Sequence, residues 1–426
     1  MSDALPRTTA PGSSGDADAP AHRDGLPLSK KLLFIGIIWV TLVLLFEVGA
    51  RVVYFVQDDF NPYYLKFGFI PDVEYTSADS DGYAKFRPNA PRHQRVGRET
   101  IAIQINANGF RADYDFATPK PAGTLRIAAL GASSTFGYSN RDHETYPYQL
   151  EQILRQQFPD RRIEVLNLGI PEARLENLIA LARAEFPSLQ PDIVTLYSGA
   201  NNATRDKPRD EAGALYRMKD WFAFHSVAWR AIHPLLLNVY YRVIKTFNRD
   251  VAGAPNLGIP VQMTPEQVER LRGGLRRAYR TQVEELAAYV DSIGATLVPI
   301  TQGYTLYRMA RFPLREGGWR SYAGEVALVD SMLARDAGLL APHTTMLIHN
   351  DLMNELRDLT AVRELPLVEG IPVLDDDREH MMSSWVHVSP TGNGRLAAAI
   401  RDVLVAHGLL DPAGPATAPR AVTHLP

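Results

Sequence analysis

Short apolar runs alternate with segments of helical spacing over residues 125–374, and this alternation constrains the fold more than any other feature of the chain. Five runs have the length of buried strands: residues 125–130, 163–168, 192–197, 296–301 and 371–374. Strands that alternate with helices favour a parallel sheet covered by helices on both faces. We therefore predict an α/β fold with a doubly wound, flavodoxin-like parallel sheet of five strands.

The segments between these runs place apolar residues at helical spacing. Helices are predicted over residues 144–158, 173–186, 264–293 and 350–362. The third has the clearest start, because Thr264 and Gln267 have the spacing of a capping box and Pro265 stands in the first helical position. Gly294 is expected to end this helix.

A second feature is the apolar segment over residues 32–56. Its uncharged part, residues 32–46, would form a helix of about 22 Å, whereas the hydrocarbon core of a bilayer is about 30 Å thick. Glu47 and Arg51 can pair on one helix face near the membrane interface, and the whole segment is then long enough to span. We predict an uncleaved signal anchor, since no small-residue cleavage site follows. A cleaved signal peptide and a buried globular helix are the alternatives.

Flanking charges predict the orientation of this segment. Three basic residues precede it and two acidic residues follow it closely: Arg23, Lys30 and Lys31, then Asp58 and Asp59. Positive charge collects on the cytoplasmic side, so everything after residue 56 is expected to be exported. The expected order is a disordered cytoplasmic tail (1–28), a transmembrane anchor (29–56), a strand-bearing extension (57–124), an α/β domain (125–410) and a disordered tail (411–426).

Composition narrows the possible classes of function. The chain has 45 Lys and Arg against 48 Asp and Glu, a net charge of −3, without the basic excess typical of nucleic-acid-binding proteins. It has no cysteine, which excludes disulfides, cysteine-ligated zinc and a cysteine nucleophile. We predict no cofactor, no metal site and no nucleic-acid partner.

The candidate functional residues follow the predicted strands, where parallel sheets carry their sites. Three short sequence blocks contain them: GASSTFG at residues 131–137, NLG at 167–169 and GANN at 199–202. A serine at a strand-to-helix turn combines an exposed hydroxyl with backbone N–H groups, which suits a nucleophile whose attack creates an oxyanion. The first block has neither the G-x-S-x-G nor the P-loop spacing, and taken alone it is more typical of a structural or phosphate-binding turn than of a nucleophile.

A fourth block, VHVSPTG, stands at residues 386–392. In this order the four blocks resemble the SGNH (GDSL-type) hydrolase superfamily, whose blocks are GDSxTxG, a glycine after the second strand, GxND, and DxxH before the last helix. The run INANGFR at residues 105–111 also resembles membrane-anchored bacterial members. The resemblance extends over residues 100–408.

The resemblance implies a role for each residue. Ser133 would be the nucleophile, and His387 would be the general base that takes its proton and returns it to the leaving group. The backbone N–H groups of Ser133 and Gly169 and the side-chain amide of Asn201 would form the oxyanion hole. The expected enzyme is a serine esterase or acyl hydrolase with an acyl-Ser133 intermediate.

Two residues depart from the family pattern. Ala132 replaces the aspartate of GDS, and Ser384 replaces the aspartate of DxxH. The second change matters more, because that carboxylate fixes the tautomer of the histidine and stabilises its charged form. Ser384 or a backbone carbonyl could orient the ring in a Ser–His dyad, a nearby carboxylate could replace the missing one, or the site is weak or inactive. The nearby carboxylates are Asp375, Asp376, Asp377 and Glu379.

An aromatic-rich insertion occupies residues 203–263. A lid, a surface resting on the membrane, and helices packed on the domain are its three open interpretations.

The resemblance also implies substrates and a location. We expect an acyl ester, with a carbohydrate ester and polysaccharide-export partner proteins suggested by family members that act on exported polysaccharides. The chain is expected in a bacterial inner membrane through residues 32–56, with its catalytic domain in the periplasm. The alternatives are an O-acetyltransferase on an exported polysaccharide and a non-catalytic binding or assembly subunit that keeps the fold.

Overall fold

The computed structural model describes residues 27–57, 83, 85–86, 88–89, 92–96, 99–204, 226–229, 232, 264–306, 321–335 and 341–410. The chain divides into two compact units, residues 1–69 with 219–232, and residues 70–218 with 233–426. Nearly all of the two predicted tails, and most of the predicted insertion 203–263, lie outside the described residues.

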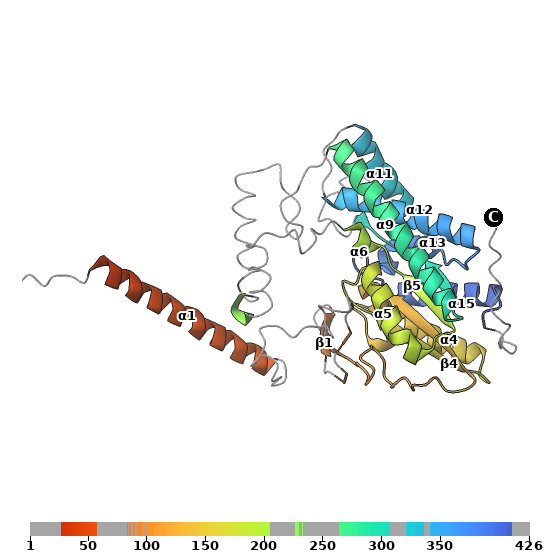
Figure 1. The fold of residues 1–426 in the computed structure, drawn as a ribbon, viewed down its shortest axis with the longest axis horizontal. Coiled ribbons are helices and arrows are strands. Elements are labelled where there is room, and N and C mark those ends of the chain that lie inside the picture. Colours follow the sequence, from red (N-terminus) through yellow and green to blue (C-terminus); the bar gives the residue numbers. More distant parts are fainter. Residues whose placement is uncertain are drawn as a thin grey trace, which may run out of the picture. The chain divides into compact units, whose positions relative to one another are not determined.

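The larger unit is built on a four-stranded parallel sheet (Figure 1). Its strands are β3 (Thr124–Gly131), β4 (Arg162–Gly169), β5 (Ile193–Tyr197) and β6 (Thr296–Ile300). β4 lies on one side of β3, and β5 and then β6 lie on the other. This is the flavodoxin-like order, so the predicted doubly wound parallel fold is confirmed.

Helices cover both faces of this sheet. One face carries α5 (Leu175–Leu189), α9 (Pro265–Ser292) and α12 (Ala341–Arg363). The other face carries α4 (Tyr146–Gln157) and α15 (Pro390–Ala406). The chain therefore buries the sheet on both sides, as a parallel sheet requires.

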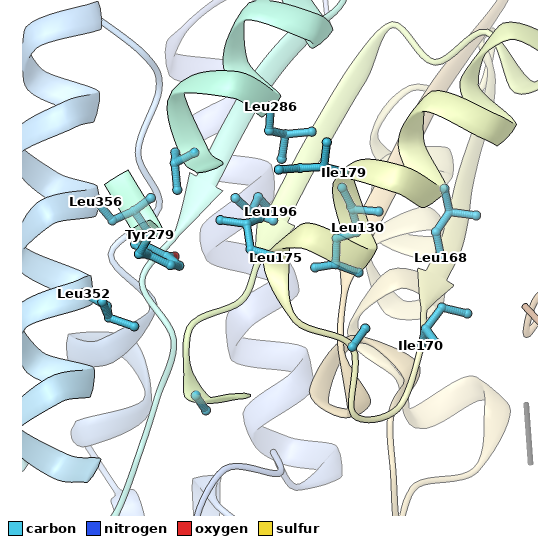
Figure 2. Packing of buried hydrophobic residues seen from close by; sticks show 14 of the residues in the cluster. Leu130, Leu168, Ile170, Leu175, Ile179, Leu196, Tyr279, Leu286, Leu352 and Leu356 are labelled. Carbon is cyan, nitrogen blue, oxygen red and sulfur yellow. The ribbon is translucent and has the colours of Figure 1, made fainter. Parts of the chain in front are cut away.

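The two hydrophobic cores follow from the alternation of side chains along each strand. Leu130 and Leu196 face the α5, α9 and α12 side, where they pack with Tyr279 and other buried residues (Figure 2). Ile127 and Val298 point to the opposite side and pack under α4 and α15. The ends of the strands are held rigidly between these cores, and the loops that follow them start from fixed points.

The helices predicted over residues 144–158, 173–186 and 264–293 are found as α4, α5 and α9. The capping box at the start of α9 forms, with the Gln267 N–H donating to the Thr264 hydroxyl at 3.3 Å. The fourth prediction, 350–362, falls inside the longer helix α12.

The predicted fifth strand at residues 371–374 is wrong. These residues belong to helix α13 (Gly370–Asp375), which buries Ile371 and Leu374. One parallel bridge, between Ile300 and Val368, lies beside β6 just before this helix. Pro372 has no N–H for a neighbouring strand but is tolerated in the first turn of a helix. A short apolar run cannot be assigned to strand or helix by periodicity alone.

The remaining elements are short or peripheral. They are β1 (Arg92–Val96), β2 (Glu99–Ile103), α3 (Ser133–Phe136), η1 (Asp142–Glu144), α6 (Ala200–Ala203), α11 (Tyr322–Ala334) and α14 (Arg378–Met381). β1 and β2 form an antiparallel pair. The segment after them belongs to the same core as the sheet, because Phe110 and Phe116 are buried there with Phe136.

The smaller unit contains helix α1 (Leu28–Gln57). Its part Leu28–Val53 has a mean hydropathy of 2.5 and is long enough to be a candidate membrane span. The predicted ion pair forms, since Arg51 Nε donates to Glu47 Oε1 at 2.8 Å.

Glu47 has a second set of partners in the same unit. Its carboxylate accepts hydrogen bonds from the Ser226 hydroxyl at 2.7 Å and from the backbone N–H groups of Val227 and Ala228, each at 3.0 Å. A side-chain carboxylate that binds the first N–H groups of a helical segment acts as a cap. Residues 226–229 of the predicted insertion are thereby attached to α1.

Candidate active site

Ser133 begins helix α3, immediately after the turn that ends β3. Gly131 is required in this turn, because a Cβ there would lie 2.1 Å from the Thr135 hydroxyl oxygen. Gly137 follows α3 with a left-handed φ of 85°, which favours glycine. The sequence thus folds into a tight turn that places a serine at a helix N-terminus on the carboxyl edge of the sheet.

The structure brings Ser133 and His387 together. His387 Nε2 lies 3.0 Å from Ser133 Oγ, although the two residues are 254 positions apart. His387 lies on the segment between α14 and α15, just before Ser389 caps α15. The separation is within hydrogen-bond reach, as a nucleophile and its general base require.

Ser384 contacts the other nitrogen of the same imidazole. Its Oγ is 2.8 Å from His387 Nδ1 and also accepts the backbone N–H of His387 at 3.0 Å. Two of the four predicted substitute carboxylates have other partners: Asp375 binds Arg378, and Asp377 binds His380. Of the three predicted outcomes for the missing aspartate, the geometry supports orientation of the ring by Ser384.

Burial sets the charge of His387. Loss of solvent lowers its pKa to about 4, so the imidazole is neutral at pH 7 and can accept a proton. The Tyr138 ring stacks on it with ring centroids 5.0 Å apart. For Nε2 to accept the Ser133 proton, Nδ1 must carry the ring hydrogen and donate it to Ser384 Oγ; this tautomer is assigned from the hydrogen bonds.

The backbone on both sides of His387 is hydrogen-bonded to the segment that carries Ser133. The Ser134 hydroxyl donates to Val386 O, and Asn140 Nδ2 donates to Val388 O, each at 3.0 Å. These two hydrogen bonds hold the residues before and after His387, and so position its ring relative to Ser133. Neither residue was given a role from the sequence, although Ser134 lies within the first block and Asn140 follows it by three residues.

Gln302, two residues after the end of β6, is a further residue that the sequence analysis missed. Its Nε2 lies 3.4 Å from Ser134 Oγ, and its Oε1 accepts the Ala200 N–H at 2.7 Å. It therefore links the loops that follow β3, β5 and β6. Its position at the end of a predicted strand is the signal that could have found it.

Asn201 lies in α6, after β5. Its Nδ2 donates to Ala173 O at 2.9 Å, which leaves the second amide hydrogen for another acceptor. Its place in the oxyanion hole stays a prediction.

Gly169 has a packing role in the structure. Its N–H donates to Asn167 Oδ1 at 3.0 Å, so a contribution to the oxyanion hole would require that bond to open. A Cβ on Gly169 would lie 2.1 Å from the Phe136 backbone nitrogen, so only glycine lets α3 lie this close to β4. Among the described residues, no group of three or more His, Asp or Glu is placed to hold a metal ion.

Residues 129–324 match the GDSL-like Lipase/Acylhydrolase family. The chain carries a GDSL-like lipase/acylhydrolase domain. The match begins inside β3, shortly before Ser133, and stops before His387. Beyond the matched residues, the chain returns to Ser133 just before α15, where His387 contacts it.

The solved structures that match this chain share little sequence with it. A lipase/acylhydrolase from Enterococcus faecalis is 13% identical, with a TM-score of 0.38 over 66% of this chain and 96% of that one. An alpha/beta hydrolase from the metagenome of Lake Arreo is 17% identical, with a TM-score of 0.35 over 68% and 97%. A variant of an acetyl xylan esterase from Geobacillus stearothermophilus is 13% identical, with a TM-score of 0.35 over 66% and 94%. A comparison of this chain with curated proteins finds no match.

Proposed function

We propose that the chain is a membrane-anchored serine esterase or acyl hydrolase that works outside the cytoplasm through an acyl-Ser133 intermediate. The 3.0 Å contact between Ser133 Oγ and His387 Nε2 carries this proposal, because it joins a nucleophile to a neutral base. Acyl transfer needs such a pair together with N–H donors for the developing oxyanion.

Acylation begins when Ser133 Oγ attacks the carbonyl carbon of the ester and His387 Nε2 takes its proton. The carbonyl oxygen becomes an oxyanion, which the Ser133 N–H and the second amide hydrogen of Asn201 stabilise. The imidazolium then gives its proton to the leaving oxygen, the C–O bond to the alcohol breaks, and acyl-Ser133 remains.

Deacylation repeats these steps with a new hydroxyl. His387 takes a proton from the acceptor, whose oxygen attacks the acyl carbon, and returns it to Ser133 Oγ as that oxygen leaves. Water as acceptor makes the chain a hydrolase, and a sugar hydroxyl makes it an O-acetyltransferase. The proposed substrate is a carbohydrate O-acyl ester, following the resemblance to membrane-anchored bacterial members.

Ser384 limits the rate of this mechanism. A hydroxyl can accept the Nδ1 hydrogen, but it cannot offset the positive charge that His387 gains when it takes the proton. In a serine protease, replacing this carboxylate costs about 10⁴-fold in rate because the histidine takes the wrong tautomer. Ser384 keeps the correct tautomer, so the loss here is limited to the missing stabilisation of the imidazolium. The proposed enzyme is therefore slower than relatives with a carboxylate at this position.

The test is turnover of p-nitrophenyl acetate by the full chain in detergent micelles, beside Ser133→Ala. The wild type should release p-nitrophenol, and the variant should fall to the background rate. Acetylated xylan, with and without an oligosaccharide acceptor, then separates release of acetate from transfer.

A non-catalytic subunit is the second candidate, and the hydroxyl of Ser384 in place of a carboxylate favours it. A folded wild type with the same background rate as Ser133→Ala would establish this alternative.

A further inference from the structure

Arg111, which follows β2, is buried, with 2% of its side chain exposed. Its Nε donates to Asp142 Oδ1 at 2.8 Å. Nη1 donates to Phe136 O and Gly137 O, both at 2.9 Å, and Nη2 donates to Asn140 O at 2.7 Å. A guanidinium presents its donors in a planar fork, so these bonds fix three backbone carbonyls relative to one another.

The first two carbonyls lie at the C-terminal end of α3, the helix that begins with Ser133. The last carbonyls of a helix have no partner within it, and a single turn is not stable alone. Arg111 Nη1 binds both carbonyls at 2.9 Å, beside the Asn140 N–H on Gly137 O at 3.0 Å and Asn167 Nδ2 on Phe136 O at 3.4 Å. The guanidinium also lies over the Phe136 ring, 4.9 Å from its centroid. Because α3 has only four residues, a shift at Phe136 moves Ser133.

The third carbonyl belongs to Asn140, whose side chain reaches the other half of the site. Its Nδ2 donates to Val388 O, next to His387. Tyr138 precedes Asn140 in the same loop and stacks on the His387 ring. The loop therefore connects Arg111 to His387, as α3 connects it to Ser133.

We propose that Arg111 is a positioning residue for acyl transfer. It keeps Ser133 and His387 at hydrogen-bond distance by fixing the two segments that carry them. This inference rests on the proposed function. Asp142 balances the buried charge and is itself held by the Gln104 N–H. A lysine would keep the charge, but its single nitrogen cannot reach all three carbonyls.

The experiment compares Arg111→Lys with wild type in p-nitrophenyl acetate turnover, with thermal melting to measure the folded fraction. Misplacing reacting groups by about 1 Å costs about 10²-fold in rate, so kcat should fall by about that factor while KM stays near the wild-type value. In Arg111→Ala, ethylguanidinium should restore part of kcat, and ethylammonium should not. A purely structural arginine would lower the melting temperature without changing kcat of the folded protein.

Arg155→Lys is the matched control. Arg155 also donates to a backbone carbonyl, Ile163 O, and pairs with the carboxylate of Glu151, but it lies away from the dyad. Its variant should keep the wild-type kcat.

Folded Arg111→Lys with wild-type kcat would overturn the inference, and so would an equal loss in Arg155→Lys. If Arg111→Lys does not fold, Asn140→Ala becomes the test of the inference. This variant keeps the backbone carbonyl of residue 140 that Arg111 binds and removes the side-chain hydrogen bond to Val388 O. An unchanged kcat in that variant would also overturn the inference. Failure of the proposed function would instead appear as an inactive wild type.

Discussion

Ser384 Oγ lies 2.8 Å from His387 Nδ1, on the opposite side of the imidazole from Ser133. The residue at the family's aspartate position therefore makes the contact expected of that aspartate, with a neutral hydroxyl in place of a carboxylate. Ring orientation is retained, whereas stabilisation of the charged imidazole is not. This difference makes the chemistry of the site testable by single substitutions.

Ser384→Asp should raise kcat for p-nitrophenyl acetate. A carboxylate would accept the Nδ1 hydrogen, as Ser384 does, and would in addition stabilise the imidazolium; in a serine protease its replacement costs about 10⁴-fold, part of it through the wrong tautomer. We expect a gain of at least about 10²-fold. Ser383→Asp is the control, because Ser383 binds His387 O and does not contact the ring. An equal gain in the control, or none in Ser384→Asp, would contradict the assigned role.

The pH profile of the wild type should show an acid limb near pH 4. His387 acts as a base only when neutral, and burial lowers its pKa to about 4, so kcat/KM should rise through that pH and stay level to pH 7. In Ser384→Asp the added negative charge favours the imidazolium, and the limb should move to higher pH. A wild-type limb near pH 6.5 would indicate an exposed histidine.

Gly169→Ala should lower both kcat and the melting temperature, because its Cβ would displace α3 from β4. Gly274→Ala in α9 is the matched control, since a Cβ there meets nothing within 4 Å. This change should raise the free energy of unfolding by about 0.5–1 kcal/mol and leave kcat unchanged. A Gly169→Ala variant with the wild-type melting temperature and kcat would rule out the close approach of α3 to β4.

The proposed topology can be tested with single cysteines, because the chain has none of its own. Val362 and Leu28 are 74% and 72% exposed, one in α12 and the other at the start of α1. In bacterial cells with a permeabilised outer membrane, an impermeant maleimide should label Val362→Cys and spare Leu28→Cys. The reverse pattern would invert the proposed orientation, and labelling of both in intact inner membranes would argue against a single span.

Sequence alone could predict the parallel sheet and the meeting of Ser133 with His387, because strand periodicity and block order determine both. It failed at residues 371–374, where four apolar residues fit a strand or a helix equally well. It placed Arg111 in the run at residues 105–111 but gave it no role, because its main partners are backbone carbonyls that leave no mark in the sequence. The packing role of Gly169 was missed for the same reason, since it depends on the backbone of α3.

The most direct test of the account is fluorophosphonate labelling of the folded full chain, with the modified residue located by peptide mass spectrometry. The account predicts covalent modification of Ser133, loss of the label in Ser133→Ala, and labelling slowed by about 10²–10⁴-fold in His387→Ala. Modification of a different serine, or labelling at Ser133 that does not depend on His387, would contradict it.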